Sequence, residues 1–288
     1  MQILDSTISL EEQIKPRRRT SREDGGAVGS LSRGLILLDV LTRASAPLTL
    51  SELAAEAGLD VSTAHRLLQI LLEQGYAVRD DSTKRYLPGP RALSPLSLFH
   101  PITQLKNEAR SVLEFLRERT SETTALVLFI GKERMVVDFV RGDHPLSPYY
   151  DTWLKSPLHG SASGKILLAS LPPAERDQLL GPAPYKSFTS ETITKQGALF
   201  SYLDIVREQG FAVARDDAYE GMTAIGAALM PYPDGRPIGC LVVTASSPAV
   251  TTAREKEIAD RLKAASQLLI SSAPSVQILK TWTGRTML

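Results

Sequence analysis

Two runs of apolar residues with helical spacing lie on either side of Gly58. The first run is Leu50, Leu53, Ala54 and Ala57, and the second is Val61, Ala64, Leu67, Leu68 and Leu71. Each run places its apolar side chains on one face of a period of about 3.6 residues, which predicts two short helices with one buried face each. Gly58 suits the left-handed conformation that often ends a helix. The stretch from Thr49 to Tyr76 is therefore predicted to be a helix-turn-helix.

The residues that precede each run agree with these helix starts. Thr49 and Glu52 have the T-x-x-E spacing of a capping box, in which each side chain bonds the backbone N–H of the other residue. Asp60 stands where its carboxylate can cap the second helix, which is expected to run to Gly75.

The second helix of such a motif presents its N-terminal residues to base edges in the major groove of DNA. Candidate DNA contacts on this helix are Ser62, Thr63, His65, Arg66 and Gln69. Arg33 and Ser51 on the two preceding helices join them. Arg66 is the candidate for reading a guanine, because arginine makes the commonest specific contact to that base. The alternative is that His65 and Arg66 are ordinary solvated residues of a helix surface.

The flanking segments extend the motif to a winged helix. Leu31, Leu35, Leu38 and Leu41 share one face of a helix predicted over 30–44. Residues 76–79 and 84–87 flank a polar turn, which predicts a β-hairpin with Lys84 and Arg85 near its tip, where a wing meets the DNA backbone. Residues 1–29 are expected to form a flexible tail. Its arginines at 17–19 either touch phosphates or form a solvated arm.

The pattern changes after a proline-rich linker over 90–101. A helix is predicted over 102–119, with apolar positions Leu105, Ala109, Val112, Leu113 and Leu116. Strands are predicted over 123–130, 135–140, 211–215, 222–231 and 236–245. Further helices are predicted over 161–171, from residue 172 onward, over 194–209 and over 251–271. Antiparallel strands mixed with helices indicate an α+β sandwich for residues 102–288, behind a winged helix-turn-helix over 30–89.

Composition places the chain among globular proteins of two domains. It has 288 residues, of which 43% are hydrophobic and 23% charged, and it has no apolar run long enough to span a membrane. The N-terminus lacks the order of a secretory signal, and a single cysteine, Cys240, suits a reducing compartment, so a cytoplasmic location is expected. Cys240 lies in an apolar strand and is interpreted as a buried small hydrophobe.

Charge gives no general support for DNA binding. The net charge is +1, and residues 30–95 hold seven cations and seven anions. If this segment binds DNA, its positive charge must gather on one face.

Several catalytic and metal chemistries are excluded. The run Gly160 to Ile166 has three residues between its glycines and no Ser or Thr after Lys165, so it is not a phosphate-binding P-loop. Its helix start either binds a carboxylate through backbone N–H groups or simply packs on the sheet. Ser163 and Lys165 point apart on a helix. His144, His159, Asp143 and Asp151 have no metal-site spacing. We therefore expect no catalytic residues, no metal and no cofactor.

Three stretches resemble the IclR-type bacterial transcriptional regulators, over about 30–272. They are the predicted helix-turn-helix with its preceding helix, the run SPLHGSASGKILLASLPPAE, and the block from Thr189 through EQGFAVARDDAYEGMTAIGAAL. The resemblance implies a winged helix-turn-helix, a linker helix and a GAF-like α/β sandwich effector domain. It also implies a homodimer, or a dimer of dimers, that binds a palindromic operator in double-stranded DNA and a small-molecule effector.

The resemblance also implies an effector pocket lined by Ser161, Ala162, Ser163, Met222, Ala224, Val242 and Thr244. Members that sense very small polar acids carry Cys at the position of Ala224, Ser at that of Val242 and Asp near Ala214 or Arg215. This chain lacks these polar groups, so its pocket is expected to take an aromatic or largely apolar molecule. Stacking surface is expected from Tyr149, Tyr150, Trp153 and Tyr219.

The expected function is that of a ligand-responsive, sequence-specific DNA-binding regulator, more in the manner of a repressor than an activator. In it, the effector shifts the arrangement of the dimer and the linker changes the spacing of the two DNA-binding heads. The alternative is a metabolite-binding or enzymatic module whose helix-turn-helix is only structural.

Overall fold

The computed structural model describes residues 29–92, 100–143, 154–232 and 235–283. The chain divides into two compact units, Met1–Ser94 and Pro95–Leu288. The predicted tail, apart from residue 29, and residues 93–99 of the predicted linker lie outside the described residues.

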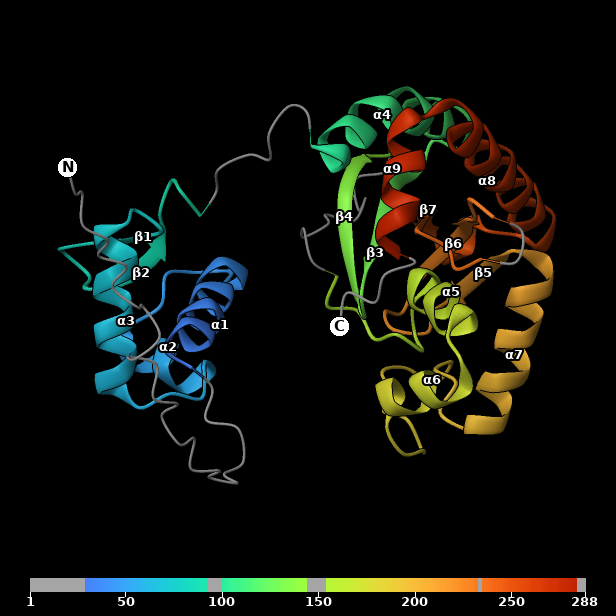
Figure 1. Cartoon of the computed structure of the whole chain (residues 1–288). Helices are drawn as coiled ribbons and strands as arrows, with labels where there is room; N and C mark the ends of the chain where they lie inside the picture. Colours follow the sequence, from blue (N-terminus) through green and yellow to red (C-terminus); the bar gives the residue numbers. More distant parts are fainter. Residues whose placement is uncertain (1–28, 93–99, 144–153, 233–234, 284–288) are drawn as a thin grey trace, which may run out of the picture. The chain divides into compact units, whose positions relative to one another are not determined.

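The N-terminal unit contains three helices and a two-stranded sheet (Figure 1). The helices are α1 (Ser30–Arg43), α2 (Leu50–Glu56) and α3 (Val61–Glu73), and the strands are β1 (Ala77–Arg79) and β2 (Tyr86–Pro88). The strands pair antiparallel with Val78 opposite Leu87, which confirms the predicted hairpin. A small core joins all five elements, and its buried members are Leu37, Leu41, Leu53, Ala54, Ala64, Leu67, Leu68, Ala77 and Tyr86.

The predicted caps of the helix-turn-helix are confirmed. The Glu52 backbone N–H donates to Thr49 Oγ1 (3.3 Å), and the Thr49 N–H donates to Glu52 Oε2 (2.7 Å). Gly58 has a φ of +64°, where a Cβ would be strained. The Asp60 carboxylate accepts from the Thr63 N–H at 2.8 Å and so caps α3. These bonds satisfy N–H groups that a helix start leaves without partners.

Two predicted burial patterns are wrong. Leu31 is 78% exposed and Leu35 is 57% exposed, whereas Leu37 and Leu41 are buried. The buried face of α1 is turned by roughly a quarter turn from the predicted leucine stripe. Val61 is likewise half exposed, because it is the first residue of α3 and lies before the part of the helix that packs on α1 and α2.

The C-terminal unit is built on one antiparallel sheet of five strands in the order β4-β3-β7-β6-β5. The strands are β3 (Thr123–Ile130), β4 (Glu133–Val140), β5 (Phe211–Arg215), β6 (Met222–Leu229) and β7 (Gly239–Ser246). All five predicted strands are present, with β4 beginning two residues earlier and β7 three residues later than expected. The unit has the α+β architecture that the sequence predicts.

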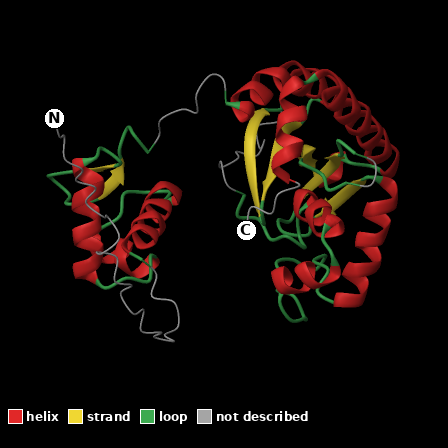
Figure 2. Ribbon diagram, viewed as in Figure 1, coloured by secondary structure: helices red, strands yellow, loops and turns green. Residues whose placement is uncertain are grey.

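Helices cover both faces of this sheet (Figure 2). One face carries α4 (Pro101–Thr120), α8 (Thr252–Ser272) and α9 (Pro274–Thr283), and the other carries α5 (Ala162–Ser170), α6 (Pro173–Leu180) and α7 (Gln196–Gln209). A short 3-10 turn, Ser247–Ala249, precedes α8. Strand alternation separates the two cores: Leu126 and Leu128 face α4 and α8, and Val127 and Phe129 face α5 and α7.

Helix α9 was not predicted from the sequence. Its Val276 and Leu279 are buried against the core that includes α4, and the Ser275 side chain hydrogen-bonds Glu108 of α4. The described helices include none that is long and apolar enough to cross a membrane.

Candidate ligand pocket and DNA-binding surface

The start of α3 presents the predicted base-contacting side chains to solvent to different degrees. Ser62, His65 and Arg66 are exposed, while Thr63 and Gln69 are half-buried. Ser62 Oγ donates to the Asp60 carboxylate at 2.7 Å, and the Gln69 amide lies 3.4 Å from His65 Nε2. Arg66 forms no ion pair with a residue that the structure describes, so its guanidinium is available to a partner.

The remaining predicted DNA contacts differ in their surroundings. Arg33 on α1 is half-buried, and Ser51 on α2 is exposed. Lys84 is exposed in the hairpin turn with a φ of +57°. Arg85 donates instead to the Pro47 carbonyl (2.8 Å) and to Glu52 Oε2 (3.2 Å), so it ties the wing to α2. Of the two cations predicted at the tip of the wing, Lys84 is therefore the one whose side chain remains directed to solvent.

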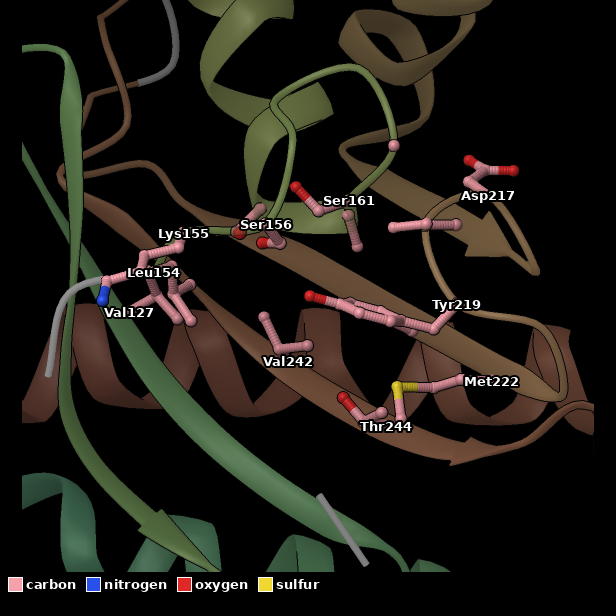
Figure 3. A pocket seen from close by; sticks show the side chains of 16 residues that line it. Val127, Leu154, Lys155, Ser156, Ser161, Asp217, Tyr219, Met222, Val242 and Thr244 are labelled. Atoms are coloured by element: carbon pink, nitrogen blue, oxygen red, sulfur yellow. The ribbon is translucent and has the colours of Figure 1, made fainter. Parts of the chain in front are cut away.

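A cavity of about 390 Å³ lies between the sheet and the start of α5 (Figure 3). Its lining residues are Val127, Leu154, Lys155, Ser156, Gly160, Ser161, Ala162, Ser163, Ala214, Asp217, Ala218, Tyr219, Met222, Ala224, Val242 and Thr244. All predicted pocket residues that fall in the described part of the chain are among them. Tyr149, Tyr150 and Trp153 lie outside the described residues.

The sheet supplies an apolar wall. Ala214 on β5 pairs with Ala224 on β6, and Ala224 pairs in turn with Thr244 on β7. Val242 lies two residues before Thr244 on the same strand face, and Val127 enters the cavity from β3. Figure 3 shows the Tyr219 ring extending across this wall, with its hydroxyl directed to the interior of the cavity.

The opposite side is formed by the segment that leads into α5. Ser161 is the N-cap residue, but its hydroxyl donates to the Pro157 carbonyl (2.7 Å) and makes no cap hydrogen bond. A Cβ on Gly164 would lie 2.2 Å from the Leu158 carbonyl oxygen, so this close approach of helix and loop requires glycine. The start of α5 is thereby held against the loop beside the cavity.

Arg134, at the start of β4, lies behind this segment and was not predicted from the sequence. Its side chain is only 4% exposed. Nη1 donates to Ser161 Oγ (2.6 Å), Ser163 Oγ (3.1 Å) and Ser156 Oγ (3.4 Å), and Nη2 donates to the Ser156 carbonyl. Burial lowers the pKa of Arg134 to about 10, which still leaves it charged at neutral pH. The sequence contains no local signal for this contact, because the serines follow 22 to 29 residues later.

Lys165 and Asp217 form a second buried polar contact next to the cavity. Lys165 is 2% exposed, forms an ion pair with Asp217 and donates to the Val213 carbonyl at 3.0 Å. Burial lowers the pKa of Lys165, and the neighbouring Asp217 carboxylate opposes that shift. Lys165 is thus directed to Asp217 and away from Ser163, as its helical position predicts.

The other side chains weighed from the sequence have structural surroundings. Cys240 is fully buried in β7, as predicted, and burial raises its pKa. His159 lies 2.9 Å from the Lys186 carbonyl through Nε2 and contacts Tyr185 and Phe188. Asp143 forms an ion pair with Arg117. His144 and Asp151 lie outside the described residues, and the described ones contain no cluster of three or more His, Cys, Asp or Glu side chains with metal-site geometry.

A winged helix-turn-helix and a second domain with an internal pocket define the class of ligand-responsive DNA-binding regulators. Family comparison agrees: residues 30–81 match the IclR helix-turn-helix domain, and residues 101–271 match the bacterial transcriptional regulator IclR C-terminal domain. The chain belongs to the IclR family of bacterial transcriptional regulators.

Individual relatives extend this match over most of the chain. The HTH-type transcriptional regulator BhcR of Paracoccus denitrificans is 29% identical over 272 residues, covering 93% of this chain and 97% of its own. The transcriptional repressor IclR of Escherichia coli is 28% identical, covering 71% and 75%. An IclR transcriptional regulator from Silicibacter sp. TM1040 has a crystal structure that is similar with a TM-score of 0.75, at 26% identity, covering 86% of this chain and 99% of its own. The protein is thus a DNA-binding transcriptional regulator, with repressors among its relatives.

Proposed function

We propose that this regulator is a repressor whose operator binding is controlled by a largely apolar or aromatic molecule in the cavity. The observation that carries the proposal is the apolar sheet wall, where Ala214, Ala224 and Val242 stand together. A cavity of about 390 Å³ is within the size range of small-molecule sites. A very small hydrophilic acid would leave most of this wall in contact with water, whereas an aromatic body covers it.

The ligand contacts that we propose are Ser161, Ala162, Ser163, Tyr219, Met222, Ala224, Val242 and Thr244. Tyr219 is 58% exposed and extends across the wall, so its ring is free to stack on a planar ligand. Met222 adds a flexible apolar side chain beside it.

On the DNA side, we propose a homodimer, or a dimer of dimers, that binds a palindromic operator. Arg66 and His65 are the exposed residues of α3 that we assign to bases, and Lys84 is assigned to the DNA backbone. A two-fold symmetric protein reads a palindrome through the distance between its half-sites. Ligand that favours one arrangement of the dimer changes the match to that distance and so changes operator affinity.

Operator binding is tested by fluorescence anisotropy with DNA from upstream of the protein's own gene and with random DNA of equal length. Arg66→Ala should weaken operator binding by about 5- to 150-fold, the equivalent of about 1–3 kcal/mol for one base contact, and weaken random binding much less. Arg43→Ala is the matched control, because it removes an arginine from α1 rather than from α3. Equal weakening on both DNAs would make Arg66 a phosphate contact, and no preference for the operator would reject the proposed function.

The ligand is tested by thermal shift with aromatic acids and amides against small aliphatic acids. Aromatic compounds should raise the melting temperature and change operator affinity. Ala224→Trp fills the cavity and should abolish both effects while leaving ligand-free operator binding in place. Stabilisation by the small aliphatic acids alone would contradict the proposed ligand class.

A further inference from the structure

Helix α9 packs against α4, the first helix of the C-terminal unit (Figure 1). It lies beyond the residues that match the IclR C-terminal domain, which end at 271. Ala273 has an extended backbone, and Pro274 lacks an N–H and disfavours a helical conformation in the residue before it, so α8 does not continue into α9. The chain therefore turns after α8, and α9 lies on α4 as a separate helix.

A carboxylate of α4 caps the start of α9. The Ser275 hydroxyl donates to Glu108 Oε2, and the Ser275 N–H donates to the same oxygen at 3.4 Å. Ser275 is fully buried, and its N–H is the first that α9 offers, because Pro274 has none. Negative charge at a helix N-terminus is favourable. This cap exists only while α9 lies on α4, so the stability of α9 is linked to its attachment.

The other end of α9 contacts the connection between β6 and β7. The Lys280 ammonium lies 4.9 Å from the centre of the Tyr232 ring, and Tyr232 follows β6. Between the two ends, Val276 and Leu279 are buried in the same core as Leu105 of α4. Helix α9 is thus held at both ends and along one face.

The C-terminal half of α4 is fastened to elements other than α9. The Leu113 carbonyl accepts from Thr124 Oγ1 of β3 at 2.9 Å. The Thr120 carbonyl accepts from Arg254 of α8, also at 2.9 Å. These hydrogen bonds tie the second half of α4 to the sheet and to α8, so we expect this half to keep its place without α9.

The N-terminal half of α4, residues 101–109, has α9 as its polar partner. Among the residues that the structure describes, its side-chain hydrogen bonds to another element are the two between Glu108 and Ser275. Leu105 and Ala109, which lie near Glu108 along the helix, are fully buried in the core to which α9 contributes. Removal of α9 would therefore take both the hydrogen bonds and part of the apolar cover from this half.

The N-terminal half of α4 is also where the linker ends. Residues 93–99 join the two compact units, and α4 begins at Pro101. If residues 101–109 came loose, the connection between the units would lengthen to residues 93–109. The effective concentration of a tethered second head at its half-site falls roughly as the −3/2 power of tether length. A longer connection would thus weaken binding to a two-site operator and leave binding to a single half-site unchanged.

We propose that α9 is a strap that fastens the linker-side half of α4 to the effector domain and thereby strengthens the binding of two-site operators. Release of the strap lengthens the connection to the DNA-binding unit without changing the DNA contacts or the cavity. The inference goes beyond ligand control, and it rests on the proposed function only for the two heads that read a palindrome.

Hydrogen–deuterium exchange of the full-length protein and of a chain ended after Ala273 tests the strap. Exchange in residues 101–109 should rise by roughly 10- to 100-fold in the shortened chain, the factor that corresponds to lost hydrogen bonds to a charged group. Exchange in residues 112–120 should stay the same. Equal acceleration in both halves would show a general loss of stability, and unchanged exchange in residues 101–109 would show that α9 does not hold them. Either result would overturn the proposal.

Point variants test the same contact with α9 in place, and they decide the proposal if the shortened chain fails to fold. Ser275→Ala and Glu108→Ala should each raise exchange in residues 101–109, and the double variant should add little, because both remove one interaction. Ser271→Ala and Glu118→Ala are the matched controls, since Ser271 bonds within α8 and Glu118 is exposed in the other half of α4. Fully additive effects of the first two variants would overturn the proposed contact.

Operator titrations measure the consequence for DNA binding. The shortened chain should bind the two-site operator roughly 3- to 10-fold more weakly than the full-length protein and bind one half of the same DNA equally well. Unchanged operator affinity, or equal losses on both DNAs, would overturn the proposed effect on DNA. A full-length protein that binds both DNAs equally would instead reject the dimeric reading of the operator, and with it that effect, while hydrogen exchange still decides whether α9 holds α4.

Discussion

Arg85 of the wing hairpin and Glu52 of α2 form an ion pair at 3.2 Å, 33 residues apart in the sequence. The same carboxylate oxygen accepts the Thr49 N–H that closes the capping box of α2. The wing and the first helix of the helix-turn-helix are thereby fixed to each other. Arg85, expected to contact the DNA backbone, has a structural partner within its own domain, whereas the Lys84 side chain has none among the residues that the structure describes.

We predict that Lys84→Ala and Arg85→Ala separate DNA contact from folding. Lys84→Ala should reduce the slope of log binding constant against log salt by about 0.9, the effect of one lost phosphate contact, without changing the melting temperature. Arg85→Ala should instead lower the melting temperature of the N-terminal unit. Salt titrations of operator binding and scanning calorimetry measure the two effects, and an unchanged slope in Lys84→Ala would remove the wing from the DNA interface.

Asp80 makes the wing turn sensitive to acid. Its carboxylate accepts from the Ser82 hydroxyl (2.6 Å) and the Ser82 N–H (2.8 Å), which lower its pKa from 3.8 to about 2. A lowered folded-state pKa adds stability above the unfolded pKa, and this stability is lost as pH falls through the folded one. We predict that Asp80→Asn lowers the melting temperature at pH 7 and that the difference disappears between about pH 4 and pH 2. A difference that is constant with pH would contradict this linkage.

The Lys165–Asp217 pair should show strong coupling. Lys165→Met alone leaves a buried carboxylate without its partner and should lower the free energy of unfolding by about 3–5 kcal/mol. The double variant with Asp217→Leu should lose much less than the sum of the single variants, because it leaves no buried charge at this position. Urea denaturation of the unmodified protein, the two single variants and the double variant measures the coupling energy. If the losses of the two single variants simply add up in the double variant, Lys165 and Asp217 do not stabilise each other.

Two helical glycines should respond in opposite ways to alanine. Gly164→Ala places a methyl group against Leu158 backbone atoms and should lower the free energy of unfolding by about 1–3 kcal/mol and weaken ligand binding. Gly197, near the start of α7, has no atom within 4 Å of the added Cβ. Gly197→Ala should therefore raise stability by about 0.5–1 kcal/mol. Similar losses of stability in both variants would show that crowding against Leu158 does not determine the effect of Gly164→Ala.

Features set by neighbouring residues were predictable from the sequence. The Thr49–Glu52 box, Gly58 and the Asp60 cap depend on contacts within three or four positions, and the structure has all three. The strands were predictable because their apolar runs are short and bounded by turn residues. The pocket residues on α5, β6 and β7 came from the family resemblance, since periodicity alone does not bring these elements together.

Features set by distant contacts were not predictable. The exposure of Leu31 depends on which face of α1 meets α3, and a leucine stripe does not contain that information. Helix α9 begins at Pro274, two residues after the last residue of α8, and a proline at that distance is also typical of a chain that leaves the helix. Arg134 reaches serines on another segment, and Lys165 reaches Asp217 52 residues away, so neither contact has a local pattern.

The cavity is assembled from two separate parts, the segment leading into α5, whose Ser163 is held by Arg134, and the apolar wall of β5, β6 and β7. Mutations in one part need not disturb the other. Substitutions at Ala224 or Val242 would therefore change the volume of the cavity without altering the contacts that hold the segment leading into α5.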